Sequence, residues 1–277
     1  MANLSEMTEA HHDNSGITSL IHEQGIDDHL ASLRYAGIIQ QALMPDPSWL
    51  KGLFRDYFVL FLPRDIVSGD FYYVFSKRQY LCIAAGDCTG HGVPGALLSI
   101  LGISFLNEIL QSKIEPKANR ILNLMREKVM KALHQTGEKS GTLDSIDIGL
   151  CIFESSSGTL QFSGANRPLI MVRNGELTEY KPDKMTIGLA PLTEHPFTNQ
   201  VINVKPGDSF YMFSDGYSDQ FGELTDKKFK HKHLKRVIES VAGYQMKRQK
   251  EVLESTFLEW KGSSQQIDDV LIFGFQI

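Results

Sequence analysis

Short apolar segments, each bounded by turn residues, recur along most of the chain and come in runs. A first run lies at 56–87, a second at 146–216, and a single segment closes the chain at 268–277. Pairs of helical patterns separate the runs, at 90–110 with 117–133 and at 228–241 with 245–260. Runs of strands that alternate with pairs of helices are typical of layered α+β folds. We therefore predict stacked antiparallel sheets flanked by helices.

The composition excludes several classes of protein. The 277 residues are 42% hydrophobic and 22% charged, which is ordinary for a globular protein. The net charge is −5, whereas nucleic acid binding needs an excess of basic residues, so we expect no nucleic acid partner. The three cysteines show no paired spacing, which favours a reducing, cytoplasmic setting. The most apolar run, 97–106, is shorter than the ~20 residues of a membrane span, so no membrane partner is expected.

The N-terminal part of the chain divides into two segments. Residues 1–26 are polar and lack sustained periodicity, which predicts a flexible arm. Residues 27–46 have helical spacing, with Asp27 or Asp28 placed to cap the start and Pro45 to end the helix. Such a helix can lie on its own domain or pack on a second copy, and its candidate dimer contacts are Leu33, Ile38 and Ile39. No repeat or linker interrupts 47–277, so we expect one domain there.

Acidic residues lie where four of the apolar segments begin or end, namely Asp70, Asp87, Asp215 and the pair Asp268–Asp269. A carboxylate at such a place costs folding energy unless it is paired, solvated or bound to a cation. Aspartates spread over this much sequence meet only if the sheets bring their strand ends to one edge. Carboxylates that meet without matching Lys or Arg neighbours repel one another, and Mg²⁺ or Mn²⁺ with their preference for oxygen ligands relieve that repulsion.

Taken alone, each of these aspartates is most simply a turn or cap residue. The neighbouring glycines favour a metal site for the set. Gly69 and Gly86 each precede a candidate ligand and Gly216 follows one, so the backbone can approach a bound ion closely. The carbonyl of Cys88 can supply one more oxygen. The sequence therefore points to a divalent metal site built from distant strand ends.

Five ordered motifs carry a resemblance to a known family: VSGDFYYVF, AAGDCTGHGVPGALLSILG, GANRPLIMVRNGEL, FYMFSDGYSDQFGE and IDDVLIFGF. In this order and spacing they resemble the bacterial metal-dependent serine/threonine phosphatases of the SpoIIE/RsbU type, relatives of the eukaryotic type 2C (PPM) phosphatases. The resemblance covers about residues 30–277. It implies an α/β/β/α sandwich of two antiparallel sheets flanked by helices, with two Mn²⁺ or Mg²⁺ ions at one edge.

The resemblance also implies roles for the acidic residues. Asp87 would bridge both metals, with Asp70 and the Cys88 carbonyl on one ion. Asp215 and Asp268 would hold the other ion, Asp268 being preferred over Asp269. A water held between the ions would attack the phosphorus in line, with no covalent enzyme intermediate.

Other residues have both a functional and a structural interpretation. His91 lies between two glycines and can protonate the departing oxygen or simply form a structural hydrogen bond. Arg64 can contact phosphate or be a plain surface arginine at a strand end. Asn166 and its neighbour Arg167 begin a strand after a turn that the family places near the metals, which indicates a substrate contact.

The resemblance implies an active phosphatase that removes phosphate from phosphoserine or phosphothreonine of a signalling protein, such as an anti-sigma-factor antagonist. Two alternatives remain: an inactive pseudo-phosphatase that only binds a partner, and a dinuclear-metal hydrolase of small phosphoesters. In the family, a helix like that of 27–46 pairs across a dimer and is coupled to activation. We therefore expect a homodimer and a regulatory partner that acts through this helix.

Overall fold

The computed structural model describes residues 14–113, 115–136, 142–189 and 195–277, with helix backbone alone for 14–26. A flexible arm is expected over residues 1–26. Its residues 1–13 lie outside the described residues, and 14–26 belong to the first helix. The helices are α1 Asn14–Leu43, α2 Pro47–Leu50, α3 Gly92–Gln111, α4 Ala118–Ala132, α5 Gly216–Asp219, α6 His231–Val241 and α7 Met246–Lys261. The strands are β1 Asp56–Leu62, β2 Phe71–Lys77, β3 Tyr80–Cys88, β4 Ile146–Glu154, β5 Thr159–Ala165, β6 Leu169–Arg173, β7 Glu176–Tyr180, β8 Gln200–Asn203, β9 Ser209–Phe213 and β10 Val270–Gln276.

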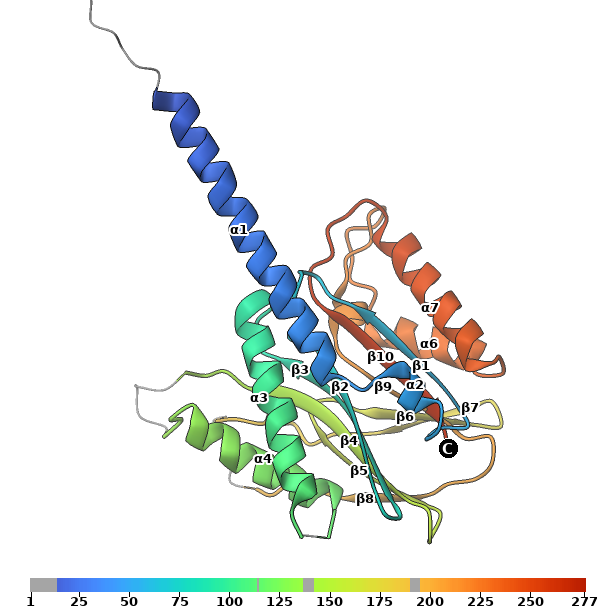
Figure 1. Cartoon of the computed structure of the whole chain (residues 1–277). Helices are drawn as coiled ribbons and strands as arrows, with labels where there is room; N and C mark the ends of the chain where they lie inside the picture. The colour runs from blue at the N-terminus through green and yellow to red at the C-terminus, as the bar shows by residue number, and fades with distance from the viewer. Residues whose placement is uncertain (1–13, 114, 137–141, 190–194) are drawn as a thin grey trace, which may run out of the picture.

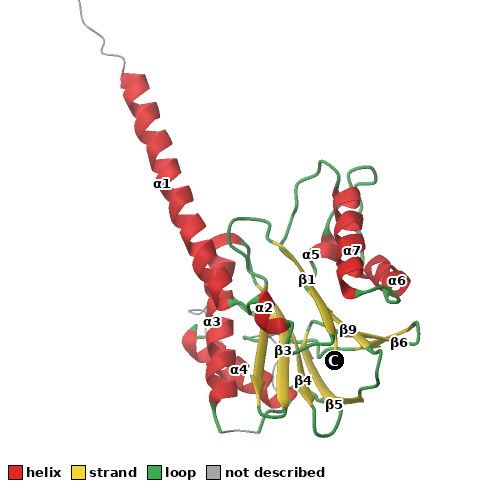
Figure 2. Ribbon diagram, turned by 45° about the vertical axis from the view of Figure 1, so that its right-hand side comes forward, coloured by secondary structure: helices red, strands yellow, loops and turns green. Residues whose placement is uncertain are grey.

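The strands form two five-stranded antiparallel sheets that stack between two layers of helices, as predicted (Figure 1). One sheet has the order β1-β10-β9-β6-β7, and the other has the order β2-β3-β4-β5-β8. Helices α3 and α4 cover the outer face of the second sheet, whereas α6 and α7 cover that of the first (Figure 2). Three separate apolar layers fill the spaces between the two sheets and the two layers of helices, so the fold is an α/β/β/α sandwich.

Strand β10 shows how the sequence produces this stacking. Side chains alternate between the faces of a strand, so a strand that is apolar on both faces must be covered on both. Leu271, Phe273 and Phe275 face the apolar layer between the sheets. Val270 and Ile272 face the layer under the helices. All five are fully buried, so the unbroken run of apolar residues predicts a central strand.

Helix α1 is longer than predicted. It begins at Asn14, not at Asp27 or Asp28, and spans 30 residues, and its N-terminal part extends away from the layers (Figures 1 and 2). Both aspartates are exposed within the helix. An exposed Asp costs a helix interior only about 0.7 kcal/mol relative to Ala, so it does not force a helix to begin there. The helix does end before Pro45, as predicted.

The C-terminal part of α1 is fixed to the domain by Gln40, whose side chain is buried. Its Nε2 donates hydrogen bonds to the carbonyl of Ser68 at 2.5 Å and to Ser99 Oγ at 2.8 Å. Its Oε1 accepts from the backbone N–H of Ser68 at 3.0 Å. Ser68 Oγ in turn accepts from the backbone N–H of Asp70 at 3.0 Å. A continuous chain of hydrogen bonds therefore links α1 to the loop that carries Asp70.

Helix α3 is long and apolar enough, by length and composition, to cross a membrane. Half of its most apolar window is buried inside the fold, where α3 packs on α4 and on strands β2, β3 and β4. The helix therefore has the surroundings of a core helix, although at 20 residues it is longer than the apolar run 97–106 on which the sequence prediction rests.

Candidate functional site

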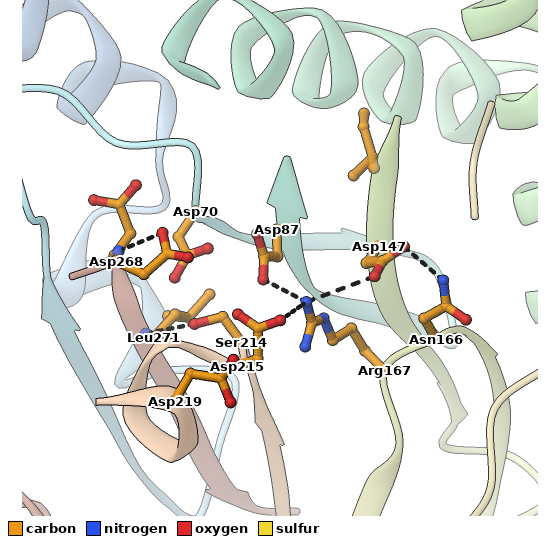
Figure 3. A network of polar contacts seen from close by, with 12 residues as sticks. Asp70, Asp87, Asp147, Asn166, Arg167, Ser214, Asp215, Asp219, Asp268 and Leu271 are labelled. Atoms are coloured by element: carbon orange, nitrogen blue, oxygen red, sulfur yellow. Dashed lines mark hydrogen bonds and ion pairs between the residues drawn. The ribbon is translucent and has the colours of Figure 1, made fainter. Parts of the chain in front are cut away.

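The four strand-end aspartates lie at one edge of the two stacked sheets (Figure 3). Asp70 precedes β2 and Asp87 lies near the end of β3, both in one sheet. Asp215 follows β9 and Asp268 precedes β10, both in the other. Their charges interact: Asp70 with Asp87, Asp87 with Asp215 and Asp268, and Asp215 with Asp268. The stacking of the sheets thus brings together residues that are up to 198 positions apart (268 − 70).

Asp70 is the most deeply buried of the four, at 2% exposure. Its Oδ2 accepts no hydrogen bond from any residue that the structure describes. Burial and, next, the negative charge of Asp87 raise the pKa of this carboxyl well above its ordinary value. A buried carboxylate oxygen without a donor is costly, so Asp70 has a free ligand position that a cation would satisfy.

Asp87 has a cationic partner that the sequence analysis did not anticipate. Arg167 Nη2 lies 2.6 Å from Asp87 Oδ2 and 2.8 Å from Asp215 Oδ2. Burial raises the pKa of Asp87 to about 7, with the charges of Asp215, Asp268 and Asp147 adding to the shift and Arg167 opposing it. The expectation of carboxylates without an arginine neighbour is therefore wrong, because the β5–β6 loop carries Arg167 into the cluster.

Asp147 is a further acidic residue of the site that the sequence analysis missed. It is the register partner of Asp87 on β4, and its Oδ2 lies 3.6 Å from Arg167 Nη2. Asn166 Nδ2 donates to Asp147 Oδ1 at 2.9 Å, and Asn166 has a left-handed backbone with φ of 57°. Asp147 is the second residue of an apolar strand, so its place near a strand end is the same signal that selected the other aspartates.

The structure separates the two neighbouring aspartates Asp268 and Asp269. Asp269 is buried and accepts backbone N–H groups on both oxygens, from Arg64 at 2.7 Å and from Gly69 at 2.8 Å. It therefore ties the β1–β2 loop to β10. Asp268 faces the other carboxylates, and burial together with the charges of Asp215 and Asp269 raises its pKa. Asp268 is thus the ligand candidate of the pair.

Two of the other candidate residues lie at the rim of the site. His91 Nδ1 is 3.0 Å from Asp65 Oδ2, and both side chains are nearly half exposed. His91 is close enough for its charge to act on Asp268. Arg64 Nη1 donates to the carbonyl of Ile267 at 2.9 Å, so its guanidinium is fixed beside the loop of Asp268.

Glycines allow the ligand loops to come together. A Cβ on Gly216 would lie 2.0 Å from the backbone oxygen of Asp269, so only glycine permits this contact between α5 and β10. A Cβ on Gly69 would lie 2.7 Å from the carbonyl of Gly90 and 3.3 Å from that of Cys88. The first approach brings the loop of Asp215 against that of Asp268, and the second brings the loop of Asp70 against that of Asp87.

The donor chemistry of this edge fits a hard divalent cation. The side chains that meet are carboxylates, and one buried oxygen of Asp70 is unpaired within the described residues. In the described part of the chain, no three Asp, Glu, His or Cys side chains stand at metal-binding spacing. The guanidinium of Arg167 lies between Asp87 and Asp215 and donates a hydrogen bond to an oxygen of each. The oxygen donors at this edge therefore fit a divalent ion in chemical type, and Arg167 occupies the position between two of them.

Comparisons with known proteins agree with this fold. The family described as "Stage II sporulation protein E (SpoIIE)" matches residues 77–277. The SiaA-PP2C domain of Pseudomonas aeruginosa is 28% identical, with a TM-score of 0.82 over 92% of this chain and 98% of that one. The PP2C phosphatase domain of SpoIIE from Bacillus subtilis, solved with a fragment of its regulatory domain, is 19% identical. Its TM-score is 0.63, over 80% of this chain and 63% of that one.

RsbX in complex with magnesium shares the fold, with 13% identity and a TM-score of 0.53 over 79% of this chain and 94% of that one. A search of curated proteins gives no match.

Proposed function

Because the chain belongs to the SpoIIE family and has the fold of PPM phosphatase domains, we propose that it is a metal-dependent protein serine/threonine phosphatase. The observation that carries the proposal is the meeting of Asp70, Asp87, Asp215 and Asp268 at one edge of the sandwich. A binding module has no physical need to gather carboxylates that repel one another. The accessible rim, where the Asp215 side chain is 41% exposed, suits a phosphoryl group on a protein surface.

The residues present would hold two Mn²⁺ or Mg²⁺ ions. Asp87 would contact both, Asp70 and the Cys88 carbonyl one of them, and Asp215 and Asp268 the other. When bound, such ions supply an activated water and neutralise the phosphoryl oxygens. Asp70 and Asp87 contribute here as ionised carboxylates, which a positive charge at this edge favours over the protonated form.

The rim residues act on the phosphoryl group and the leaving oxygen. His91 is the proposed general acid, since its Nδ1 is held by Asp65 and its Nε2 can then donate a proton to the departing serine or threonine oxygen. Arg64 and Asn166 are the proposed phosphate contacts, and both already have a hydrogen-bond partner that fixes their position.

A phosphatase assay with two substrates tests the proposal. We expect Mn²⁺-dependent release of phosphate from a phosphoserine peptide, and loss of that activity on addition of EDTA. A His91→Gln variant should slow hydrolysis of the peptide by about 100-fold, the scale of general acid catalysis. It should slow p-nitrophenyl phosphate hydrolysis less, because nitrophenolate leaves without protonation.

The two alternative functions give different results in that assay. A pseudo-phosphatase would bind the phosphopeptide and release no phosphate with either substrate. A hydrolase of small phosphoesters would turn over p-nitrophenyl phosphate but not the peptide. Metal-independent turnover of the peptide would contradict the proposed site.

We also propose a cytoplasmic homodimer that a partner regulates through α1, with a phosphorylated signalling protein as substrate. Ile38 and Ile39 are 62% and 47% exposed on α1, although they are large and apolar. The hydrogen bonds of Gln40 connect this helix to the loop of Asp70. A partner that contacts α1 would therefore act, through these hydrogen bonds, on the position of Asp70, a proposed metal ligand.

Sedimentation measures the dimer directly. We expect the wild-type chain to sediment as a dimer at high micromolar concentration and Ile38→Glu to shift it toward monomer, because a charge cannot be buried in an apolar contact. Gln41→Glu, at an exposed position of the same helix, is the matched control and should leave the dimer intact. A wild-type chain that is a strict monomer at this concentration would rule the dimer out.

A further inference from the structure

The side chain of Arg167 contacts the acidic edge through one charged nitrogen. One nitrogen, Nη2, is shared between Asp87 Oδ2 at 2.6 Å and Asp215 Oδ2 at 2.8 Å, with Asp147 Oδ2 at 3.6 Å. The guanidinium thus does not form a paired, two-nitrogen contact with either Asp87 or Asp215, and Nε has no partner among the described residues. A single positive centre surrounded by carboxylate oxygens is the arrangement expected of a bound cation (Figure 3).

Burial and the hydrogen bonds of its loop both stabilise Arg167 at this place. It is 14% exposed, so its charge acts with little screening by water. Its loop is fixed on both sides: the backbone N–H of Arg167 donates to the carbonyl of Ala165 at 2.7 Å, and Asn166 is bonded to Asp147. Without a positive charge at this place, Asp87, Asp147 and Asp215 would repel one another at the edge of the sheets.

Arg167 contacts one oxygen on each of two aspartates, Asp87 and Asp215, that the proposed function assigns to divalent ions. Mg²⁺ needs its oxygen ligands at about 2.0–2.1 Å. An ion at that distance from Asp87 Oδ2 and Asp215 Oδ2 would collide with Nη2 and be repelled by its charge. The ion and the guanidinium therefore compete for the same two carboxylates.

From this competition we infer that Arg167 is a built-in counter-cation, which stabilises the carboxylate cluster before metal binds and must withdraw for the ion to bind. This inference rests on the proposed metal site and gives Arg167 a role within it. It has two consequences that oppose each other: Arg167 lowers the affinity for metal, and it stabilises the chain when no metal is bound.

Calorimetric titration with Mn²⁺ tests the first consequence. We expect Arg167→Gln to bind Mn²⁺ at least about 5-fold more tightly than wild type, the lower end of typical coupling between two sites. The matched control is Arg173→Gln. Arg173 also pairs with a buried aspartate, Asp208, at 2.6 Å, but away from the acidic edge. This control should leave the affinity for Mn²⁺ unchanged.

Thermal unfolding tests the second consequence. In EDTA, Arg167→Gln should unfold at a lower temperature than wild type, and saturating Mn²⁺ should remove most of that difference. Arg173→Gln should be destabilised equally in EDTA and in Mn²⁺. If Arg167→Gln does not fold, an NMR titration of the wild-type chain is used in its place. The Nε–H signal of Arg167 should then shift on addition of Mg²⁺.

The outcomes separate this inference from the proposed function. Equal or weaker Mn²⁺ binding by Arg167→Gln, or an Arg167 signal that ignores Mg²⁺, overturns the inference and leaves the phosphatase proposal standing. Failure of the wild-type chain to bind Mn²⁺ or Mg²⁺ overturns both.

Discussion

Replacement of Asp87 by Asn is expected to lower kcat/KM on a phosphoserine peptide by at least about 100-fold. Even residues that only orient a metal ligand cost 10–100-fold in metal affinity or activity when they are changed, and Asp87 is the proposed ligand of both ions. The loss should appear in kcat and in the affinity for Mn²⁺ together. Steady-state kinetics with the phosphopeptide and calorimetric titration with Mn²⁺ measure the two effects.

The variant should still fold, because Asn has nearly the shape of Asp and removes a charge that its neighbours Asp215, Asp268 and Asp147 oppose. Asp208→Asn is the control. Asp208 is another buried strand-end aspartate, but it pairs with Arg173 and accepts the backbone N–H of Lys205 at 2.7 Å. This control should lose stability and keep its activity per folded molecule. Wild-type turnover by a folded Asp87→Asn enzyme would show that Asp87 is not a ligand.

Replacement of Gly216 by Ala is expected to have the largest effect on folding. The new Cβ would lie 2.0 Å from the backbone oxygen of Asp269 and 3.3 Å from Cβ of Asp268. Backbone cannot yield as a flexible side chain does, so α5 and the start of β10 would have to separate. Overpacking of this kind costs about 3 kcal/mol of unfolding free energy. Because Asp215 precedes Gly216 directly, the same displacement should abolish Mn²⁺ binding.

Gly243→Ala is the matched control for this effect. Gly243 is exposed, has no left-handed backbone and would place its Cβ with nothing within 4 Å. Chemical denaturation should show a normal free energy of unfolding for Gly243→Ala and a much lower one for Gly216→Ala. Equal stability of the two variants would mean that the close approach of α5 to β10 is not maintained in solution.

Much of the fold is readable from local pattern. The runs of strands and the pairs of helices are where the sequence places them, because side-chain period acts over a few residues. Turn chemistry is equally local, and the Asn174–Gly175 pair joins β6 to β7 with the residue types that favour a two-residue hairpin turn. The hairpin is a clear case, since both residues have positive φ, as a two-residue turn of this kind requires. The start of α1 at Asn14 was not predicted, because Asp27 and Asp28 can cap a helix or lie exposed inside one.

The candidate site also has features that local sequence predicts and features that only the tertiary structure decides. The types of its acidic residues, their positions at strand ends and the glycines beside them are properties of the sequence, and they already indicate an oxygen-rich metal site. Sheet pairing and stacking decide which carboxylates meet. They place Asp147 opposite Asp87, and they place Asp269 where it accepts hydrogen bonds from two backbone amides.

Arg167 shows the limit most clearly. It lies 80 positions from Asp87 and 48 from Asp215, and its motif indicates a substrate contact near the metals but not that it pairs with both aspartates. The sequence by itself determines the chemistry that is available, since donor types and strand ends are local. The tertiary structure alone decides which charges face one another, since Coulomb energies depend on distances in space and on burial.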